Sequence, residues 1–337
     1  MAIERKPATP VEGTVEQDSE QEISIAIENP ESVAIETEDG GVIIDFDPNA
    51  SKVQDMGFDS NLAELMDDSK LNTIGKDLID SYTGDKESRA DWEETYTKGL
   101  DQLGLKFEDR TEPWAGACGV FHPMMSEAVI RFQSQAISEM FPAQGPVRTK
   151  IVGKDTVEKT RQAGRVQDYL NYLLTYQMKE YRSETERMLF SLPLAGSAFR
   201  KVYYDPTLGR PCSLFVPAED VIVNYGASEL DTCERATHVM KKSSNDVRKM
   251  QVNGFYRDID LPAGSPNTSD IAKKYDEMTG DVDTYSLDNR HILLEMQVDL
   301  DLEGFEDTDD EGNSTGIALP YVVTLDYPSG KILSIRR

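Results

Sequence analysis

The sequence predicts an α+β fold in which helices come first and a strand-rich, antiparallel half follows. Two observations carry this prediction. Up to about residue 195, apolar residues recur at helical spacing, whereas beyond it short β-branched and aromatic runs are bounded by Gly and Pro. We therefore divide the chain into an acidic, mostly disordered arm (1–55), a mainly helical part (56–195) and a mixed antiparallel sheet part (196–337).

The first seventy residues carry about half of the excess negative charge. The whole chain has 35 Lys and Arg against 62 Asp and Glu, a net charge of −27, and residues 1–70 hold 18 acidic and 4 basic residues. The only aromatic residues of this region are Phe46 and Phe58. Such a segment buries too little apolar surface to offset the entropy of ordering it. We therefore expect residues 1–55 to be mostly disordered.

The composition also bears on the class of protein. Strong acidity disfavours a nucleic-acid coat, which usually has a basic face, but it is compatible with a channel through which DNA slides. The three cysteines, Cys118, Cys212 and Cys233, show no CxxC spacing, which fits free thiols in a reducing compartment. The chain has no run of eighteen apolar residues and its N-terminus has no apolar signal core, so we predict a soluble protein without a membrane span.

The helical part begins with apolar spacing over residues 59–82, which predicts two short helices joined near Asn72. Residues 88–105 predict a further helix, with Ser88 as its N-cap and Gly104 at its end.

Residues 124–141 predict a helix that begins after Pro123. Its bulky apolar stripe, which indicates a core helix, consists of Met125, Val129, Phe132, Ala136 and Met140.

The alternation over 147–152 predicts a strand, and the longest helical stretch follows over 155–192. Its apolar face is formed by Val166, Leu170, Leu173 and Leu174. A break near 181–183 would divide this stretch into two helices, because Ser183 and Glu186 have the spacing of a capping box.

The strand-rich half opens with a hairpin. Residues 198–204 form its first strand, Pro206 and Gly209 favour the turn, residues 214–216 return, and residues 221–223 add a third strand. Beyond it we predict, in order, a strand over 237–241, a helix over 244–252 capped by Asn245 or Ser244, a loop over 261–269, a helix over 270–278, a strand over 291–300, an acidic loop over 302–316 and a hairpin over 321–337 that turns at 328–330. Because the chain stops on the second strand of that hairpin, we expect the natural product to extend past residue 337.

The motifs that carry chemistry are incomplete. Residues 307–312 begin like an EF-hand loop, but position 12, which must supply a bidentate Glu, is Ala318. The Walker and GxGxxG patterns are absent, and no serine lies in a GxSxG elbow. His122, His238 and His291 lie far apart in the sequence, and Cys118 and His122 lie in one short loop, which is an unusual spacing for a nucleophile and its base. We therefore assign no catalytic, cofactor-binding or metal-binding residue and predict that the protein is not an enzyme.

Two further features allow two readings each. Basic residues cluster at Arg161 and Arg165, Arg200 and Lys201, Lys241 and Lys242, and Arg248 and Lys249. Each pair could contact a phosphate or simply form the polar face of its element. The tyrosine-rich stretch 169–181 is more typical of a packing surface than of a base-stacking platform, and it would suit a subunit interface because Tyr and Arg are enriched there.

Several runs of residues resemble the portal proteins of short-tailed double-stranded DNA bacteriophages. They are EPWAGACGVFHPMMSEAVIRFQSQAISEMFPAQGPVRTKIVG (112–153), LPLAGSAFRKVYYDP (192–206), FVPAEDVIVNYGAS (215–228), THVMK (237–241) and GFYRDIDLP (254–262). The resemblance extends over roughly residues 90–337 and lies in the ordered series of runs rather than in any one of them. The arm before residue 60 has no such resemblance.

The resemblance implies a structural and mechanical function. Portal subunits form a ring, usually of twelve, at one capsid vertex of the virion, after assembly in the host cytoplasm. The ring is the head-tail connector: it is the channel for DNA packaging and ejection, and it binds terminase, major capsid protein, scaffold and tail adaptor proteins. On this reading the chain is mostly the wing of such a subunit, while the tunnel helix and crown lie beyond residue 337. DNA-contacting residues stay unknown, and no cofactor or membrane is implied.

Two alternatives stay open at this point. A metal-dependent nuclease or hydrolase of the packaging apparatus would use clustered carboxylates, and another virion adaptor protein would share the structural role without the channel. Divalent-metal-dependent DNA cleavage distinguishes the first from a portal, and ring size distinguishes the second.

Overall fold

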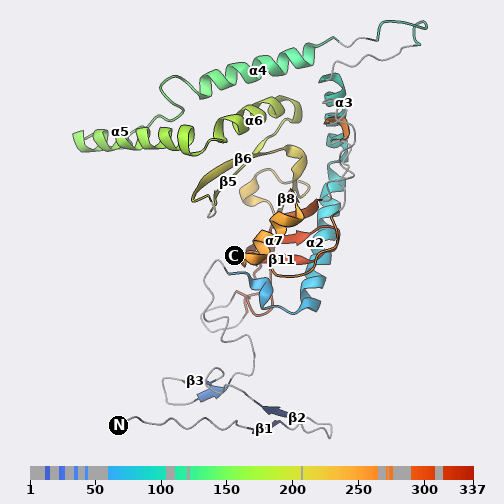
Figure 1. The fold of residues 1–337 in the computed structure, drawn as a ribbon, viewed down its shortest axis with the longest axis vertical. Helices are drawn as coiled ribbons and strands as arrows, with labels where there is room; N and C mark the ends of the chain where they lie inside the picture. The colour runs from blue at the N-terminus through green and yellow to red at the C-terminus, as the bar shows by residue number, and fades with distance from the viewer. Residues whose placement is uncertain are drawn as a thin grey trace.

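The structure is a computed structural model of the 337-residue chain. It describes residues 60–103, 111–119, 122–205, 208–264, 271, 273–275, 290–307 and 314–337, together with the backbone of four short strands nearer the N-terminus. Helices dominate the first half and antiparallel sheets the second, so the predicted α+β class is confirmed (Figure 1).

The four N-terminal strands form two separate antiparallel pairs. They are β1 (Glu12–Val15) with β2 (Ile23–Ala26), and β3 (Ala34–Glu36) with β4 (Val42–Ile44). The remainder of the arm over 1–55, for which we predicted disorder, lies outside the described residues.

A five-stranded antiparallel sheet forms the main body. Its order is β11-β10-β9-β8-β7, and its strands are β7 (Val221–Val223), β8 (Arg235–Lys242), β9 (His291–Leu300), β10 (Leu319–Asp326) and β11 (Ile332–Arg336). The predicted strands at 237–241 and 291–300 and the hairpin that turns at 328–330 are confirmed. Alternation along β9 sends Leu294 to one face and Leu293 to the other, and both are fully buried. The sheet is therefore covered on both sides.

A helix covers one face of this sheet. Helix α2 (Asp68–Ser88) follows the 3-10 turn η2 (Leu62–Glu64), and its buried side chains Leu71, Leu78 and Tyr82 pack against β9, β10 and β11. The predicted pair of short helices joined near Asn72 is wrong: Asn72 is an exposed residue within one continuous helix. The buried stripe runs through without a break, and this packing outweighs the local polar residues.

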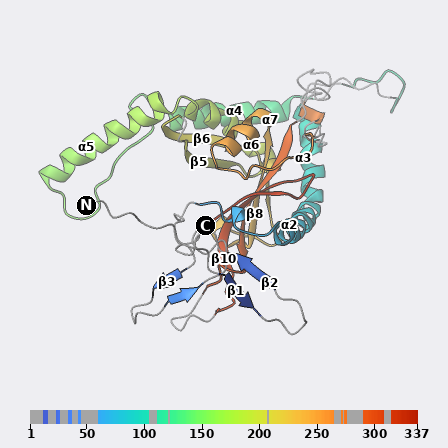
Figure 2. The same ribbon diagram turned by 60° about the horizontal axis from the view of Figure 1, so that its bottom comes forward.

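Helix α3 (Ala90–Leu103) continues the column after a single non-helical residue, Arg89. The predicted N-cap Ser88 instead ends α2, where its hydroxyl donates to the Asp85 carbonyl over 2.6 Å. Gly104, the predicted end of the helix, lies outside the described residues. Figure 2 shows α2 and α3 on the same side of the molecule.

The other face of the sheet is covered by α7 (Ser244–Val252) and the segment after it. Val247 and Tyr256 pack there against Leu293 and Leu333. The predicted cap at Ser244 or Asn245 is displaced by one residue, because the Ser243 hydroxyl accepts from Asp246 N and caps α7. Of the predicted helix over 270–278, Ile271 and residues 273–275 are described and helical.

The side chain of Asn61 pairs with the peptide groups at the outer edge of strand β11. Asn61 is buried, its amide nitrogen donates to the Leu333 carbonyl over 3.0 Å, and its amide oxygen accepts from Ile335 N over 3.0 Å. The same oxygen accepts from Ala63 N and starts η2. One amide thus serves β11 in place of a neighbouring strand, which protects an edge that would otherwise expose unpaired peptide groups.

Three helices and a hairpin form a second layer above the sheet (Figure 1). They are α4 (Met124–Met140), α5 (Val157–Tyr172) with its π-helical continuation η3 (Leu173–Gln177), α6 (Tyr181–Ala195), and β5 (Phe199–Asp205) paired with β6 (Arg210–Val216). Their core lies between α3, α4, α6 and the 3-10 turn η4 (Ala218–Asp220).

The predicted break in the long helical stretch is confirmed, but its cause is different. The chain leaves the helix at Met178 and re-enters it at Tyr181. The predicted capping box is wrong, because Ser183 lies inside α6 and donates to the Glu180 carbonyl, while Glu186 pairs with Arg182. Helix α6 ends at Gly196, whose φ of 80° closes the helix in the left-handed conformation.

Two predicted strand assignments also change. Residues 147–152 form no strand; instead the side chain of Asn171 on α5 bonds both the N–H and the carbonyl of Val147. The predicted third strand of the hairpin, β7, pairs with β8 in the five-stranded sheet rather than with β6. The turn η4 after Pro217 redirects the chain from one sheet to the other. Among the described residues, no helix combines the length and the apolar character needed to cross a membrane.

Two glycines of α2 allow a matched test of this packing. A Cβ at Gly75 would lie 2.2 Å from the carbonyl oxygen of Gly330, whereas a Cβ at Gly84 meets nothing within 4 Å. We expect Gly75→Ala to lower the free energy of unfolding by more than about 2 kcal/mol, because the hairpin turn must move away. Gly84→Ala should raise it by about 0.5–1 kcal/mol through helix propensity. Urea unfolding of both variants checks this, and equal effects would contradict it.

Candidate subunit interface

The junction between the helical column and the sheet is held by Arg89. Its guanidinium donates to the carbonyl oxygens of Ala218, Glu219 and Val221 over 3.1, 2.6 and 2.9 Å. It also forms an ion pair with Glu93 one turn along α3. A planar group with five donors is suited to such convergent acceptors. No sequence motif points to Arg89, because its partners lie about 130 residues away in the chain.

A second contact joins the β5–β6 hairpin to the sheet. Lys201 on β5 forms an ion pair with Glu295 on β9, and Nδ1 of His238 on β8 lies 3.9 Å from the same carboxylate oxygen. Burial alone would raise the pKa of Glu295, but the neighbouring His238 and Lys201 side chains outweigh burial and lower that pKa to about 2. Lys201 thus joins the β5–β6 hairpin to the sheet, as Arg89 joins the helical column to η4 and β7.

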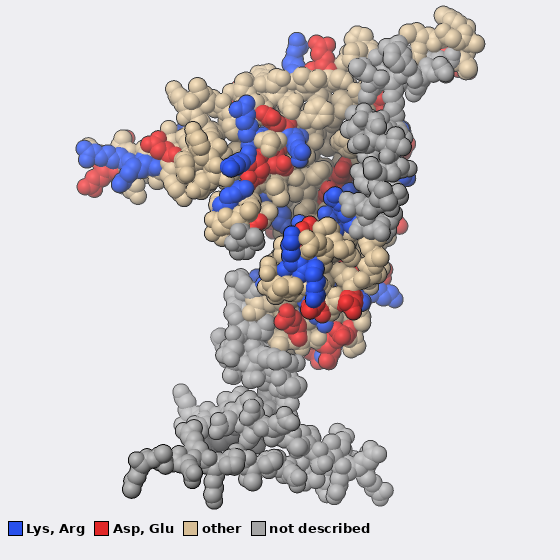
Figure 3. Space-filling model, in the orientation of Figure 1, with Lys and Arg blue, Asp and Glu red and all other residues tan. Residues whose placement is uncertain are grey.

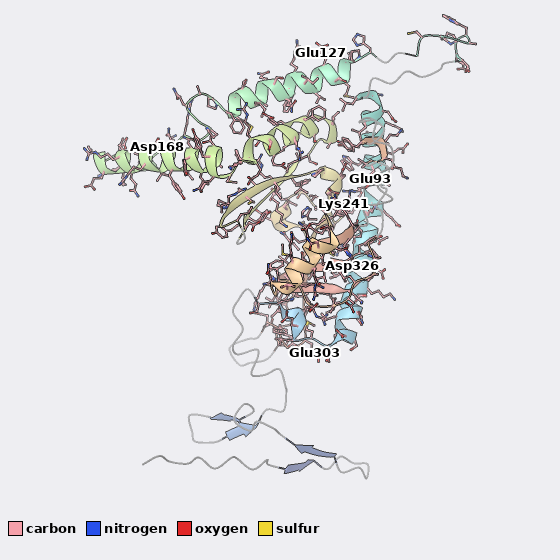
Figure 4. The ribbon with its side chains drawn as sticks, viewed as in Figure 1. Glu93, Glu127, Asp168, Lys241, Glu303 and Asp326 are labelled. Atoms are coloured by element: carbon pink, nitrogen blue, oxygen red, sulfur yellow. The ribbon has the colours of Figure 1, made fainter. Side chains whose placement is uncertain are left out.

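A hollow of about 610 Å³ lies beside the Arg89 junction, between the helical column and η4. Glu93 and Lys241, labelled in Figure 4, line it together with Glu219 and Asp220. Burial, reinforced by the charge of Asp220, raises the pKa of Glu219 to about 7, and burial also raises the pKa of Asp220. Glu219 Oε2 is buried without a hydrogen-bond partner in the described structure. The hollow therefore buries two neighbouring carboxylates at an electrostatic cost and is not a formed binding site.

The outward side of the upper layer is unusually apolar. In α4 only Val129 is buried, whereas Ile130, Phe132 and Met140 are 53%, 42% and 37% exposed. The predicted core stripe on 124–141 is thus confirmed at Met125 and Val129, which belong to the core of the upper layer, but not at Phe132 and Met140. Helix α4 packs on α6, with Gln133 donating to the Glu186 carbonyl, and on α3, where Ser126 donates to the Leu103 carbonyl; its remaining side is exposed. Exposed apolar surface of this kind is typical of a protein interface.

Helix α5 extends this open surface. None of its side chains is buried, and Tyr169, Tyr172 and Tyr176 are more than half exposed. Tyr172 and Tyr176 stack on each other with ring centroids 5.7 Å apart. The β5–β6 hairpin adds Val202, Tyr204 and Leu208, which are also more than half exposed. The tyrosine-rich stretch is therefore largely open at the surface.

The four basic pairs are in different environments. Lys201 pairs with Glu295, Arg200 donates to Thr185 Oγ1, Arg248 pairs with Asp258, and Lys249 pairs with Asp246. Lys241 lines the hollow beside Arg89. By contrast, Arg161 and Arg165 on α5 are exposed, and neither has an ionic partner among the residues that the structure describes.

The candidate catalytic and metal-binding motifs do not assemble into a site. Cys118 and His122 are both exposed at a loop. The EF-hand-like run begins at Asp307, which accepts from Thr315 Oγ1, and residues 308–313 lie outside the described part. Within the described residues, no group of three or more His, Cys, Asp or Glu side chains is placed to hold a metal ion.

One arrangement has the order of a Ser-His-Asp triad. Ser244 Oγ lies 3.1 Å from His291 Nε2, and His291 Nδ1 lies 3.8 Å from the buried Asp326 carboxylate. The second distance is too long for a hydrogen bond. Asp246 also stands in the first turn of α7, where its negative charge would oppose a developing oxyanion. We interpret these residues as a polar contact that joins α7 to the sheet.

Comparisons with known proteins do not identify a family. No protein-family model matches the chain, and no curated protein matches it at a significant level. The resemblance to portal proteins therefore stays a prediction.

The raised pKa of Glu219 predicts a pH dependence of stability. The folded state holds the proton up to about pH 7, whereas the unfolded chain releases it near its ordinary value of 4.5. The free energy of unfolding should therefore fall as pH rises from about 4.5 to 7, by up to on the order of 3 kcal/mol. Glu219→Gln should flatten this slope and be more stable than the wild type at pH 8. Urea unfolding between pH 5 and 8 measures it, and an unchanged slope would contradict the assignment.

The exposure pattern of α4 predicts that substitutions at two adjacent residues change the free energy of unfolding by different amounts. Val129→Ala should lower the free energy of unfolding by about 2 kcal/mol, because Val129 is 2% exposed. Ile130→Ala should change it by less than about 0.5 kcal/mol in dilute, monomeric protein. At higher concentration Ile130→Ala should weaken self-association more than Val129→Ala does, as measured by sedimentation. Equal destabilisation by the two variants would show that α4 is covered within the subunit.

Proposed function

We propose that the chain is a subunit of a bacteriophage portal ring. The ring stands at one capsid vertex of the virion, forms the channel for DNA packaging and ejection, and connects head to tail. Its partners are further copies of the chain, terminase, major capsid protein, scaffold and tail adaptor proteins. The residue runs between 112 and 262 that resemble this family support the proposal.

The observation that carries the proposal is the open helical layer. Helix α4 has one buried side chain in 17 residues and α5 has none in 16, so most of their apolar side chains gain little from folding alone and are unfavourable to leave in water. A subunit that assembles would cover these surfaces. An assembled ring accounts for both helices at once.

The charge of the chain also suits a DNA conduit. A net charge of −27 keeps unassembled subunits apart and gives DNA little to adhere to. Binding to phosphates requires basic surfaces. DNA would therefore pass such a protein more easily than it would bind to it.

We propose no catalytic role for this part of the molecule. The two half-buried carboxylates with raised pKa values, Glu219 and Asp220, lie near the positive charges of Arg89 and Lys241, which partly offset the effect of burial on their pKa values. A metal-dependent nuclease would need further ligands around them. No observation on the described residues favours that alternative over the portal.

Electron microscopy of the negatively stained protein tests the proposal directly. We expect closed rings whose central opening is wide enough for duplex DNA, with scaffold protein added where assembly requires it. A uniform monomer or dimer at micromolar concentration, with and without scaffold, would contradict the portal function. Rings too narrow for DNA would indicate a different virion component.

An assay for DNA cleavage separates the enzymatic alternative. Incubation of duplex DNA with the protein and Mg²⁺ or Mn²⁺ should leave the DNA intact. Robust cleavage that Asp220→Asn abolishes would overturn the proposal that this chain is not an enzyme. Glu127→Gln, which alters an exposed carboxylate on α4 outside this hollow, is the control.

A further inference from the structure

We propose that helix α5 of one copy docks on the acidic outer face of α2 and α3 of the next copy. This inference rests on the proposed function as a ring subunit and names the two surfaces that meet. It commits to a second copy of this chain as the occupant.

The first step is that α5 needs a partner. It is 16 residues long, none of its side chains is buried, and an isolated helix of this length is only marginally stable in water. Within the subunit it is supported along one side, where Asn171 bonds Val147 and where Thr149 bonds Gln167 and the Ala163 carbonyl. The remaining sides face solvent.

The second step is the composition of the free side. Arg161, Arg165, Tyr169, Tyr172 and Tyr176 follow one another at spacings of 4, 4, 3 and 4, so they share one face of the helix. All five are exposed. Tyr and Arg are the residues most enriched at the energetically important centres of interfaces. Glu158 and Asp168 are exposed on the same face, so its N-terminal part carries charges of both signs and the tyrosines follow toward the C-terminal end.

The third step is the surface that fits it. Asp77, Asp80, Glu87 and Asp91 lie on the side of α2 and α3 opposite the buried stripe, and all four are exposed. None of them has an ionic partner among the described residues. Lys76, four residues before Asp80, is an exposed cation on the same side, so acidic residues predominate in this row, which is unfavourable for like charges. Two arginines from another copy would neutralise it.

Gly84 leaves part of the helix backbone uncovered within this acidic row. It lies between Asp80 and Glu87, and a Cβ there would meet nothing within 4 Å. Gly75 in the same helix is required by the nearby Gly330 carbonyl, but nothing in the subunit requires Gly84. A glycine in a helix interior costs about 1 kcal/mol. Its absent side chain leaves room for a tyrosine ring to lie on the helix backbone.

The two surfaces stand on opposite sides of the subunit. In Figures 1 and 2, α5 projects from one side, and α2 and α3 form the other. Figure 3 shows both Lys and Arg and Asp and Glu along the projecting end. Contact between two different surfaces is head-to-tail, so each copy leaves one of each free for the next. Repetition of such a contact closes into a ring when the rotation permits.

Charge reversal on each surface tests the contact. Arg161→Glu with Arg165→Glu, and separately Asp80→Lys with Glu87→Lys, should each lower the ring population at least tenfold, because like charges then face each other. Circular dichroism and the thermal transition of the subunit should be unchanged, since all four side chains are exposed. Mass photometry and negative-stain microscopy measure the ring population. Lys249→Glu with Arg337→Glu, which reverses two exposed charges elsewhere, is the matched control.

Mixing the two defective variants provides the decisive measurement. In an equimolar mixture, the acidic α5 of one variant meets the basic column of the other, and the unchanged α5 of the second meets the unchanged column of the first. Rings of alternating composition should therefore reappear. Failure of the mixture to form rings, or normal ring assembly by either variant alone, would overturn the docking proposal and leave the portal function standing.

The remaining outcomes are equally informative. If the wild type forms no rings under any condition, the proposed function fails rather than the docking contact. If Arg161→Glu with Arg165→Glu assembles normally but loses affinity for a labelled DNA duplex, the occupant of α5 is DNA and the proposal is overturned.

Discussion

The hydrogen bonds of the Arg89 guanidinium are the interaction on which the arrangement of the two layers depends. Three carbonyl oxygens, at the point where the chain passes from the hairpin into the sheet, accept from this one side chain. Arg89 stands where α2, which covers the sheet, gives way to α3, which covers the second core. Glu93 and the ring of Trp92, 5.3 Å away, complete its surroundings. A half-buried cation is tolerated only with such partners, and here they define the angle between helix column and sheet.

Local patterns predicted most of the elements because periodicity and turn residues are local properties. The strand over 291–300 and the turn at 328–330 came directly from them. The strand expected over 147–152 did not form, because a strand needs an edge to pair with and the side chain of Asn171 took the peptide groups of Val147 instead. Asn72 suggested a break in a helix that the continuous contact with the sheet keeps whole. In each case the deciding partner lies outside the window in which the pattern is read.

The surface features were harder to predict for a physical reason. An apolar stripe on a helix has the same composition whether its own chain or another copy covers it, so the stripe on α4 was assigned to the core. Only the structure shows that Phe132 and Met140, two members of this stripe, are exposed while Val129 is buried. The tyrosines of α5 are exposed, as a subunit interface would require, and that interface stays a prediction. The role of Arg89 could not be predicted, because its partners are backbone carbonyl groups, which every residue has.

The hydrogen bonds between Asn61 and β11 have a consequence for folding during synthesis. Asn61 and strand β11 are separated by more than 270 positions in the sequence, yet the buried amide of Asn61 hydrogen-bonds this strand. Gly75 and Gly330 likewise touch across the length of the chain. On the ribosome, α2 emerges long before β11 exists, and its apolar face has no sheet to rest on. The nascent protein must therefore hold that face exposed for most of translation, which is the period when chaperones bind and when chains aggregate.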